Sequence, residues 1–99
     1  MTISKTENGK EVTVSVEGRI DSKTAPEFEK EVKDCFESFD SMVIDLAQVN
    51  YVSSAGLRVL LSLHKIMMKK GSMKLVNVNE EVCDVFEVTG FDEILNYNE

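Results

Sequence analysis

The sequence predicts a single α/β domain built on a mixed, mainly parallel sheet of about four to five strands. Apolar strand-like segments alternate with amphipathic helical segments, and short turn signals separate them, which is the pattern of strands joined by helical crossovers. The chain has 99 residues, of which 42% are hydrophobic, enough to bury one core. We therefore expect residues 1–99 to form one domain.

The N-terminal segment predicts a β-hairpin. In EVTVSVEG, residues 11–18, three valines alternate with polar residues, as in a strand with one buried face, and this strand should end at Gly18. A preceding strand over residues 2–6 would pair with it through Asn8-Gly9, a dipeptide typical of tight hairpin turns.

The next segment, TAPEFEKEVKDCFESF, predicts an amphipathic helix over residues 24–39. Thr24 and Glu27 have the spacing of a capping box, and Pro26 falls in the first turn, where its missing N–H costs nothing. One apolar face recurs at helical spacing. Its members are Phe28, Val32, Cys35, Phe36 and Phe39.

The continuous apolar run SMVIDLA, residues 41–47, predicts a buried central strand. After the segment YVSSAG, a long helix should run to about Lys70 and end at Gly71.

The C-terminal third predicts one more strand and one more helix. MKLVNV, residues 73–78, has the pattern of a strand, and Asn79 should cap a helix that ends at Thr89-Gly90. The tail over residues 91–97 predicts a short helical turn or an edge strand, which would be the fifth.

Charge and composition argue against several kinds of partner and site. The net charge of −7 disfavours nucleic acid and an anionic membrane surface, because both select clustered Lys and Arg. Cys35 and Cys83 lie in apolar helical patterns and predict reduced core residues. A single histidine without a CxxC motif offers no zinc site, and phosphate-loop motifs for a cofactor are absent. The N-terminus lacks a signal-peptide pattern and no segment is long enough to span a membrane, so we expect a cytoplasmic protein.

The segment YVSSAG joins the central strand to the longest helix. A helix N-terminus has unpaired N–H groups and the positive end of the dipole, which favours an anion. A hydroxyl there could cap the helix, hold a ligand phosphate, act as a nucleophile or be phosphorylated. Physical reasoning alone favours capping by Ser53 or Ser54. Nucleophilic catalysis is disfavoured, because G-x-S-x-G is absent and His64 lies about 15 Å along the helix from Ser54.

The long helix has more apolar surface than one sheet contact needs. Arg58, Ser62, Lys65 and Lys69 fall within an arc of roughly 60°. Apolar residues flank this basic stripe on both sides, namely Leu61, Met68, Val59 and Ile66. Either one flank stays exposed as a docking surface beside the serines, or neighbouring helices cover both.

Three blocks of the sequence resemble the STAS domain of bacterial anti-sigma-factor antagonists. The blocks are GRIDSKTAPEFEKEV, MVIDLAQVNYVSSAGLRVLL and MKLVNVNEEVCDVFEVTGFDEIL, of which SSAGLRVLL and F-x-x-TGF are the most specific parts. The resemblance implies a small sheet with helices packed mainly on one side. It also implies partner switching: the unphosphorylated antagonist binds an anti-sigma factor that is a GHKL-type serine kinase and so frees the sigma factor. Phosphorylation by that kinase releases the antagonist, and a serine phosphatase resets it.

The same resemblance implies which residues form the site. The family pattern Asp-Ser-[Ser/Thr]-Gly-Leu puts Ser54 at the phosphoacceptor position, with Ser53, here in place of Asp, as the alternate. Asp21 matches an acidic position near the acceptor. The implied pocket and partner surface comprise Asp21, Ser53, Ala55, Gly56, Leu57, Arg58 and Leu61.

Two other hypotheses remain at this stage. The domain could be a STAS module that is never phosphorylated and binds a nucleotide or scaffolds a protein partner. An enzyme is the least favoured, because no acid–base pair, metal set or nucleophile–base pair is visible in the sequence.

Overall fold

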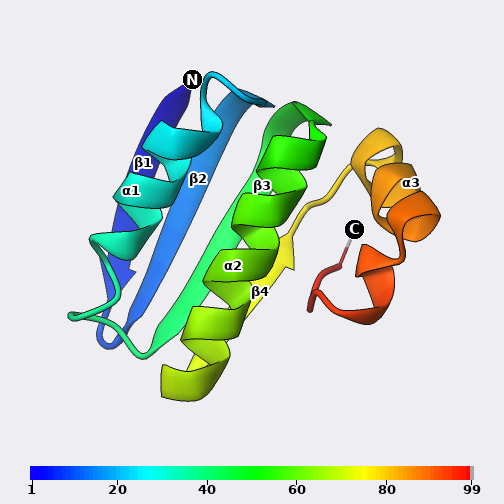
Figure 1. The fold of residues 1–99 in the computed structure, drawn as a ribbon. Coiled ribbons are helices and arrows are strands. Elements are labelled where there is room, and N and C mark those ends of the chain that lie inside the picture. The colour runs from blue at the N-terminus through cyan, green and yellow to red at the C-terminus, as the bar shows by residue number, and fades with distance from the viewer. Residues whose placement is uncertain (99) are drawn as a thin grey trace.

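In the computed structural model, which describes residues 1–98, helices α1 and α2 lie across one face of a four-stranded sheet (Figure 1). The strand order is β1-β2-β3-β4, with β1 antiparallel to β2 and the other pairs parallel. This confirms the mixed, mainly parallel sheet. The elements are β1 (Thr2–Asn8), β2 (Glu11–Ile20), α1 (Ala25–Lys33), β3 (Ser41–Val52), α2 (Ser54–Lys70), β4 (Ser72–Val76), α3 (Glu80–Thr89) and a 3-10 turn, η1 (Phe91–Glu93).

The predicted hairpin is confirmed, but β2 runs further than expected. The strand does not end at Gly18, which adopts a φ of 114° at an irregularity in the pairing with β3. Beyond this register shift the pairing resumes, so that Arg19 lies opposite Tyr51 and Ile20 opposite Val52. Because of these extra residues, β2 and β3 end next to each other, at Ile20 and Val52.

The predicted capping box at the start of α1 is wrong. Thr24 lies at the N-cap position with a helical backbone, and its side chain caps nothing. Its hydroxyl instead donates to the Arg19 carbonyl at 2.7 Å and accepts from the amide of Asp21 at 2.9 Å. These two bonds hold the turn between β2 and α1. Because they occupy the Thr24 hydroxyl, that oxygen does not cap the helix.

Helix α1 is also shorter than predicted. It ends at Lys33, and the chain continues to Phe39 as turns. Backbone bonds from the amides of Cys35 and Phe39 keep this segment curled, so both side chains are still buried. Phe36, expected on the core face, is only half-buried.

The core lies between the helices and the sheet. Alternate residues of β2 and β3 are buried, as the period-two pattern of a strand covered on one face requires. Helix α2 closes the core with four side chains, Leu57, Leu60, Leu63 and Met67. Burial of each such side chain contributes about 1.5–3 kcal/mol.

The C-terminal region combines the two structures predicted for it. Asn79 caps α3 as expected, its side-chain oxygen accepting from the amide of Val82 at 2.9 Å. The tail forms the η1 turn and then a single parallel bridge between Tyr97 and Leu75 of β4. The Tyr97 ring packs edge-on against Phe86, with centroids 5.0 Å apart. Within residues 1–98, no helix has both the length and the hydropathy needed to cross a bilayer.

Candidate functional site

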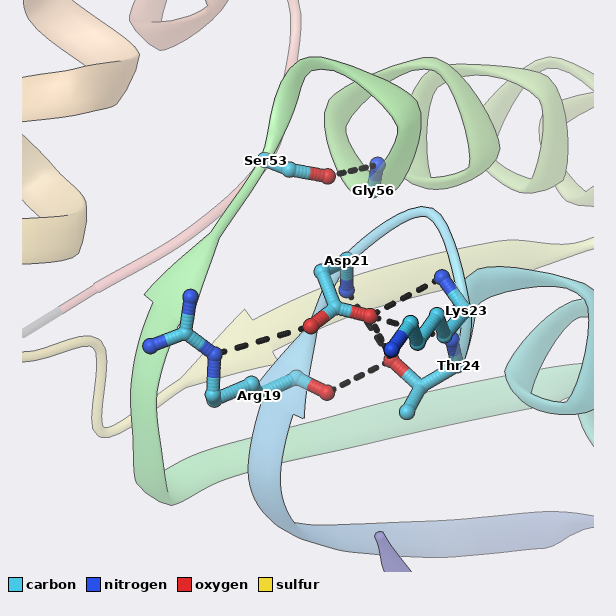
Figure 2. A network of polar contacts seen from close by, with 6 residues as sticks. All are labelled: Arg19, Asp21, Lys23, Thr24, Ser53 and Gly56. Carbon is cyan, nitrogen blue, oxygen red and sulfur yellow. Dashed lines mark hydrogen bonds and ion pairs between the residues drawn. The ribbon is translucent and has the colours of Figure 1, made fainter.

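The candidate site lies where β2 and β3 end side by side. The amide of Ser53 donates to the carbonyl of Ile20 at 2.9 Å, which extends the pairing of Ile20 with Val52 by one step. Figure 2 shows Asp21, the residue after β2, close to Ser53 at the start of α2. Parallel pairing therefore brings together two site residues that are far apart in the sequence.

Ser53 is the cap of α2. Its backbone is extended, with φ −82° and ψ 175°, and its Oγ accepts from the amide of Gly56 at 3.2 Å (Figure 2). Of the two serines considered for capping, Ser53 fills that role, as a residue with β-region backbone just before a helix should. Ser54 is the first helical residue and is exposed, and nothing within residues 1–98 forms a hydrogen bond with its hydroxyl. The two adjacent hydroxyls therefore differ in both role and access.

Gly56 lets the first turn of α2 pack directly on the end of β2. A Cβ at this position would lie 2.7 Å from the Ile20 oxygen and 3.0 Å from a Val52 methyl. These approaches are closer than side-chain atoms tolerate, so the residue has to be glycine if the helix is to keep its place. The position of both serines depends on this contact.

Leu57 is a core residue. Its side chain is 5% exposed and joins the buried cluster under α2. The helix turns this position toward the sheet, so little of the Leu57 side chain is accessible, and its place in a partner surface stays a prediction.

Asp21 organises the turn beneath the serines. One carboxylate oxygen accepts from the amides of Lys23 at 3.0 Å and Thr24 at 3.1 Å, and the other lies 3.5 Å from Nε of Arg19 (Figure 2). The backbone bonds from Thr24 and Lys23, with help from Arg19, lower the pKa of the Asp21 carboxyl below its usual value. Asp21 thus carries a negative charge at neutral pH beside the N-terminus of α2.

No pattern in the sequence predicts the contact between Arg19 and Tyr51. The guanidinium lies 4.3 Å from the centre of the Tyr51 ring, a cation–π distance, while also pairing with Asp21. The two residues are opposite each other only because the register shifts twice, between Ser15 and Glu17 and again between Gly18 and Arg19. Only the alignment of β2 against β3 could have revealed this pair.

The outer surface of α2 beside the serines is apolar and basic. A shallow groove of about 410 Å³ is lined by Arg58, Leu61, Ser62, Lys65 and Ile66. Leu61 is half-buried, whereas Ile66 and Met68 are exposed, with 37% and 54% of their surface accessible. The helix flanks are therefore not fully covered, which favours the first of the two interpretations. Nε of Arg58 donates to the Ser54 carbonyl at 3.4 Å, so this cation lies next to Ser54.

A family model for the STAS domain matches residues 2–99. The chain belongs to the STAS domain family. The resemblance seen in the sequence is thereby confirmed. The STAS-type fold, with α1 and α2 on one side of the sheet, is confirmed as well.

Relatives of this STAS domain are antagonists of anti-sigma factors. It is 31% identical over 91 residues to the anti-sigma-B factor antagonist of Bacillus subtilis (strain 168), a match that spans 91% of this chain and 84% of the relative. The crystal structure of an anti-sigma factor antagonist from Mycobacterium paratuberculosis superposes with a TM-score of 0.87 at 27% identity, over 97% of this chain and 83% of that one. The unphosphorylated form of the anti-sigma factor antagonist SpoIIAA shares the fold, with a TM-score of 0.81 at 13% identity, over 99% of this chain and 89% of that one.

In this STAS domain the predicted site residues divide by exposure. Ser54 and Arg58 are exposed, and Asp21, Ser53, Ala55 and Leu61 are partly accessible. Gly56 and Leu57 are buried and serve the packing of α2. The geometry offers an exposed hydroxyl at a helix N-terminus next to the apolar, basic face of α2, with the Asp21 carboxylate near the neighbouring Ser53.

Proposed function

We propose that this STAS domain is an anti-sigma factor antagonist whose binding to its partner is controlled by phosphorylation of Ser54. The observation that carries the proposal is the exposed Ser54 hydroxyl on the first residue of α2, next to the accessible groove of the same helix. The names of the relatives support the class of partner. In this proposal the domain is a binding module and not an enzyme.

Ser54 is a better phosphoacceptor than Ser53. A kinase has to reach the hydroxyl and seat it against a phosphoryl donor, and Ser54 is exposed. The Ser53 oxygen is occupied by the amide of Gly56 and its residue is half-buried. Phosphorylating Ser53 would therefore disturb the cap, whereas phosphorylating Ser54 leaves it in place.

A phosphate on Ser54 would change the surface without unfolding the domain. It would bring a charge of about −1.5 to −2 to the positive end of α2, where an anion is favourable. Arg58, already bonded to the Ser54 carbonyl, is within one helical turn and would pair with the phosphate. That pairing would draw a cation away from the groove, and a partner packed over the dianion would face a desolvation cost of several kcal/mol.

The proposed cycle follows from this change. The unphosphorylated domain binds an anti-sigma factor along α2 and frees the sigma factor. That anti-sigma factor is a GHKL-type serine kinase, it phosphorylates Ser54, and the complex dissociates. A serine phosphatase removes the phosphate and restores binding. We assign this cycle to the cytoplasm, where sigma factors act.

The experiment that tests the proposal is phosphorylation by the cognate anti-sigma kinase with ATP, followed by mapping of the product by mass spectrometry. Ser54→Ala should abolish labelling, and Ser53→Ala, with its fold checked by circular dichroism, should retain it. Labelling undiminished in Ser54→Ala would overturn the assignment of the acceptor. Failure of the kinase to bind the unphosphorylated domain would overturn the proposed function.

A further inference from the structure

The acidic charge of the chain is concentrated in its last quarter. Residues 77–99 contain seven Asp or Glu and no Lys or Arg, which equals the net charge of −7. Since the chain has 18 acidic side chains in total, the other 11 match its 11 basic ones. The region of α3 and η1 is therefore acidic on an otherwise balanced molecule.

Helix α3 has one buried face and one unusual outer face. Val82, Cys83 and Phe86 are buried against the rest of the domain. On the outer side, Val88 is 87% exposed, the most exposed large hydrophobic residue within residues 1–98. We call the outer side, made of Glu81, Asp84, Val85, Val88 and Thr89, the α3 face.

The α3 face combines an apolar hollow with carboxylates. A hollow of about 220 Å³ is lined by Asp84, Val85, Val88 and Thr89. The Thr89 hydroxyl donates to the Val85 carbonyl at 2.7 Å, so its polar atom is already satisfied within the helix. Glu81, Asp84, Val85 and Val88 recur at the spacing of one helical stripe, which sets acidic and apolar side chains next to each other. In Figure 1, α3 lies at the side of the domain, outside α2 and β4.

We propose that the α3 face binds a basic amphipathic helix of a partner protein. An apolar side chain of that helix would seat against Val85 and Val88, and its Lys or Arg side chains would pair with Glu81 and Asp84. Charge selects this occupant, because nucleic acid and anionic membranes are repelled by a surface without cations. The surface is opposite in charge to the groove of α2, so the two faces recruit different partners. This inference does not depend on phosphorylation of Ser54.

A second copy of the chain is the competing occupant, since the α2 groove is apolar and basic. Contact between α2 of one copy and α3 of the next would be a head-to-tail arrangement, which closes into a ring only for particular rotations and otherwise forms open chains. A basic helix from a separate protein does not have to form a closed ring. Proteins commonly bind an amphipathic helix through apolar side chains spaced along one of its faces.

The test is a titration of the ¹⁵N-labelled full chain with an amphipathic helical peptide made of Leu and Lys, followed by NMR. Chemical-shift changes should centre on residues 81–89, and a peptide with Glu in place of Lys should bind far more weakly. Val88→Ser, which removes the apolar contact without adding charge, should lower the affinity by about tenfold, because one buried valine contact is lost. The matched control, Met68→Ser on α2, should leave it unchanged.

Two results would overturn the proposal. One is a peptide that perturbs α2 or binds Val88→Ser as tightly as the unchanged chain. The other is self-association in sedimentation experiments that both Val88→Ser and Met68→Ser abolish, which would assign the α3 face to a second copy. Phosphorylation of Ser54 should proceed normally in Val88→Ser, so failure here is distinguishable from failure of the proposed switch.

Discussion

The amide of Ser53 and the carbonyl of Ile20 form a hydrogen bond of 2.9 Å that links the end of β2 to the start of α2. Through this bond the turn that contains Asp21 and the helix that begins with Ser54 are held in fixed relation. Side chains at the surface therefore depend on backbone packing just beneath them, which makes several effects measurable.

Replacing Gly56 should destabilise the domain. In Gly56→Ala the new methyl meets the Ile20 oxygen at 2.7 Å, and relieving this overlap should cost about 1–3 kcal/mol of unfolding free energy. Urea denaturation followed by circular dichroism measures it. Ser54→Ala, an exposed change in the same helical turn, serves as the control and should differ from the unchanged domain by less than about 0.5 kcal/mol. Equal stability of Gly56→Ala and the unchanged domain would contradict this account of the packing.

Removing the cap at Ser53 should weaken α2. Ser53→Ala leaves the Gly56 amide without its acceptor and should lower the unfolding free energy by about 1 kcal/mol. Ser53→Asn offers a comparable cap and should restore most of the loss. Thermal denaturation of the three proteins gives the comparison, and identical melting of Ser53→Ala and Ser53→Asn would show that capping is unimportant here.

The charge of Asp21 should make stability depend on pH. Its folded pKa lies below the unfolded value of about 4, so its contribution is fully present above that value. The contribution disappears as the pH falls through the lowered folded pKa. Asp21→Asn should therefore be less stable than the unchanged domain at pH 7, and the difference should shrink as the pH drops below about 4. Urea denaturation at pH 7 and pH 3 measures the two differences, and a difference that stays constant would rule out this role for the carboxylate.

A negative charge at Ser54 should weaken binding to the anti-sigma factor. We expect Ser54→Asp to reduce the affinity at least about tenfold, which corresponds to ~1.4 kcal/mol. Ser54→Asn has nearly the same size without the charge and should bind within a few-fold of the unchanged domain. Isothermal titration calorimetry with the purified partner gives both values. Equal affinities for the two variants would mean that charge does not drive release.

Arg58 should contribute to partner binding through its charge. Arg58 lines the α2 groove, and Arg58→Gln should slow association and reduce the dependence of affinity on salt. Lys30→Gln, an exposed charge change on α1, is the control and should alter neither. Surface plasmon resonance at several salt concentrations measures the association rate and the dissociation rate separately. Unchanged association of Arg58→Gln would indicate that the partner does not lie along this groove.

Local sequence signals determined most of the elements. The hairpin between β1 and β2, the start of α2 at the serines with its end at Gly71, and the cap at Asn79 all appear where the sequence predicted them. The hairpin turn itself lies one residue later than Asn8-Gly9, at Gly9-Lys10, because Asn8 pairs with Glu11. Each depends on bonds within one turn or one hairpin, so neighbouring residues suffice to specify it. The helix N-terminus at the two serines is local in the same way, whereas the choice of Ser54 as acceptor comes from the family resemblance and stays a prediction.

The tertiary structure alone decided which distant residues meet. Arg19 stacks on Tyr51, and Gly56 presses on Ile20, only because β2 continues past Gly18 and pairs with the end of β3. Thr24 matched a capping box in sequence, yet its hydroxyl bonds the Arg19 carbonyl instead. The register between strands and the bonding partner of the Thr24 hydroxyl depend on the packing of the whole domain. No single stretch of sequence specifies that packing.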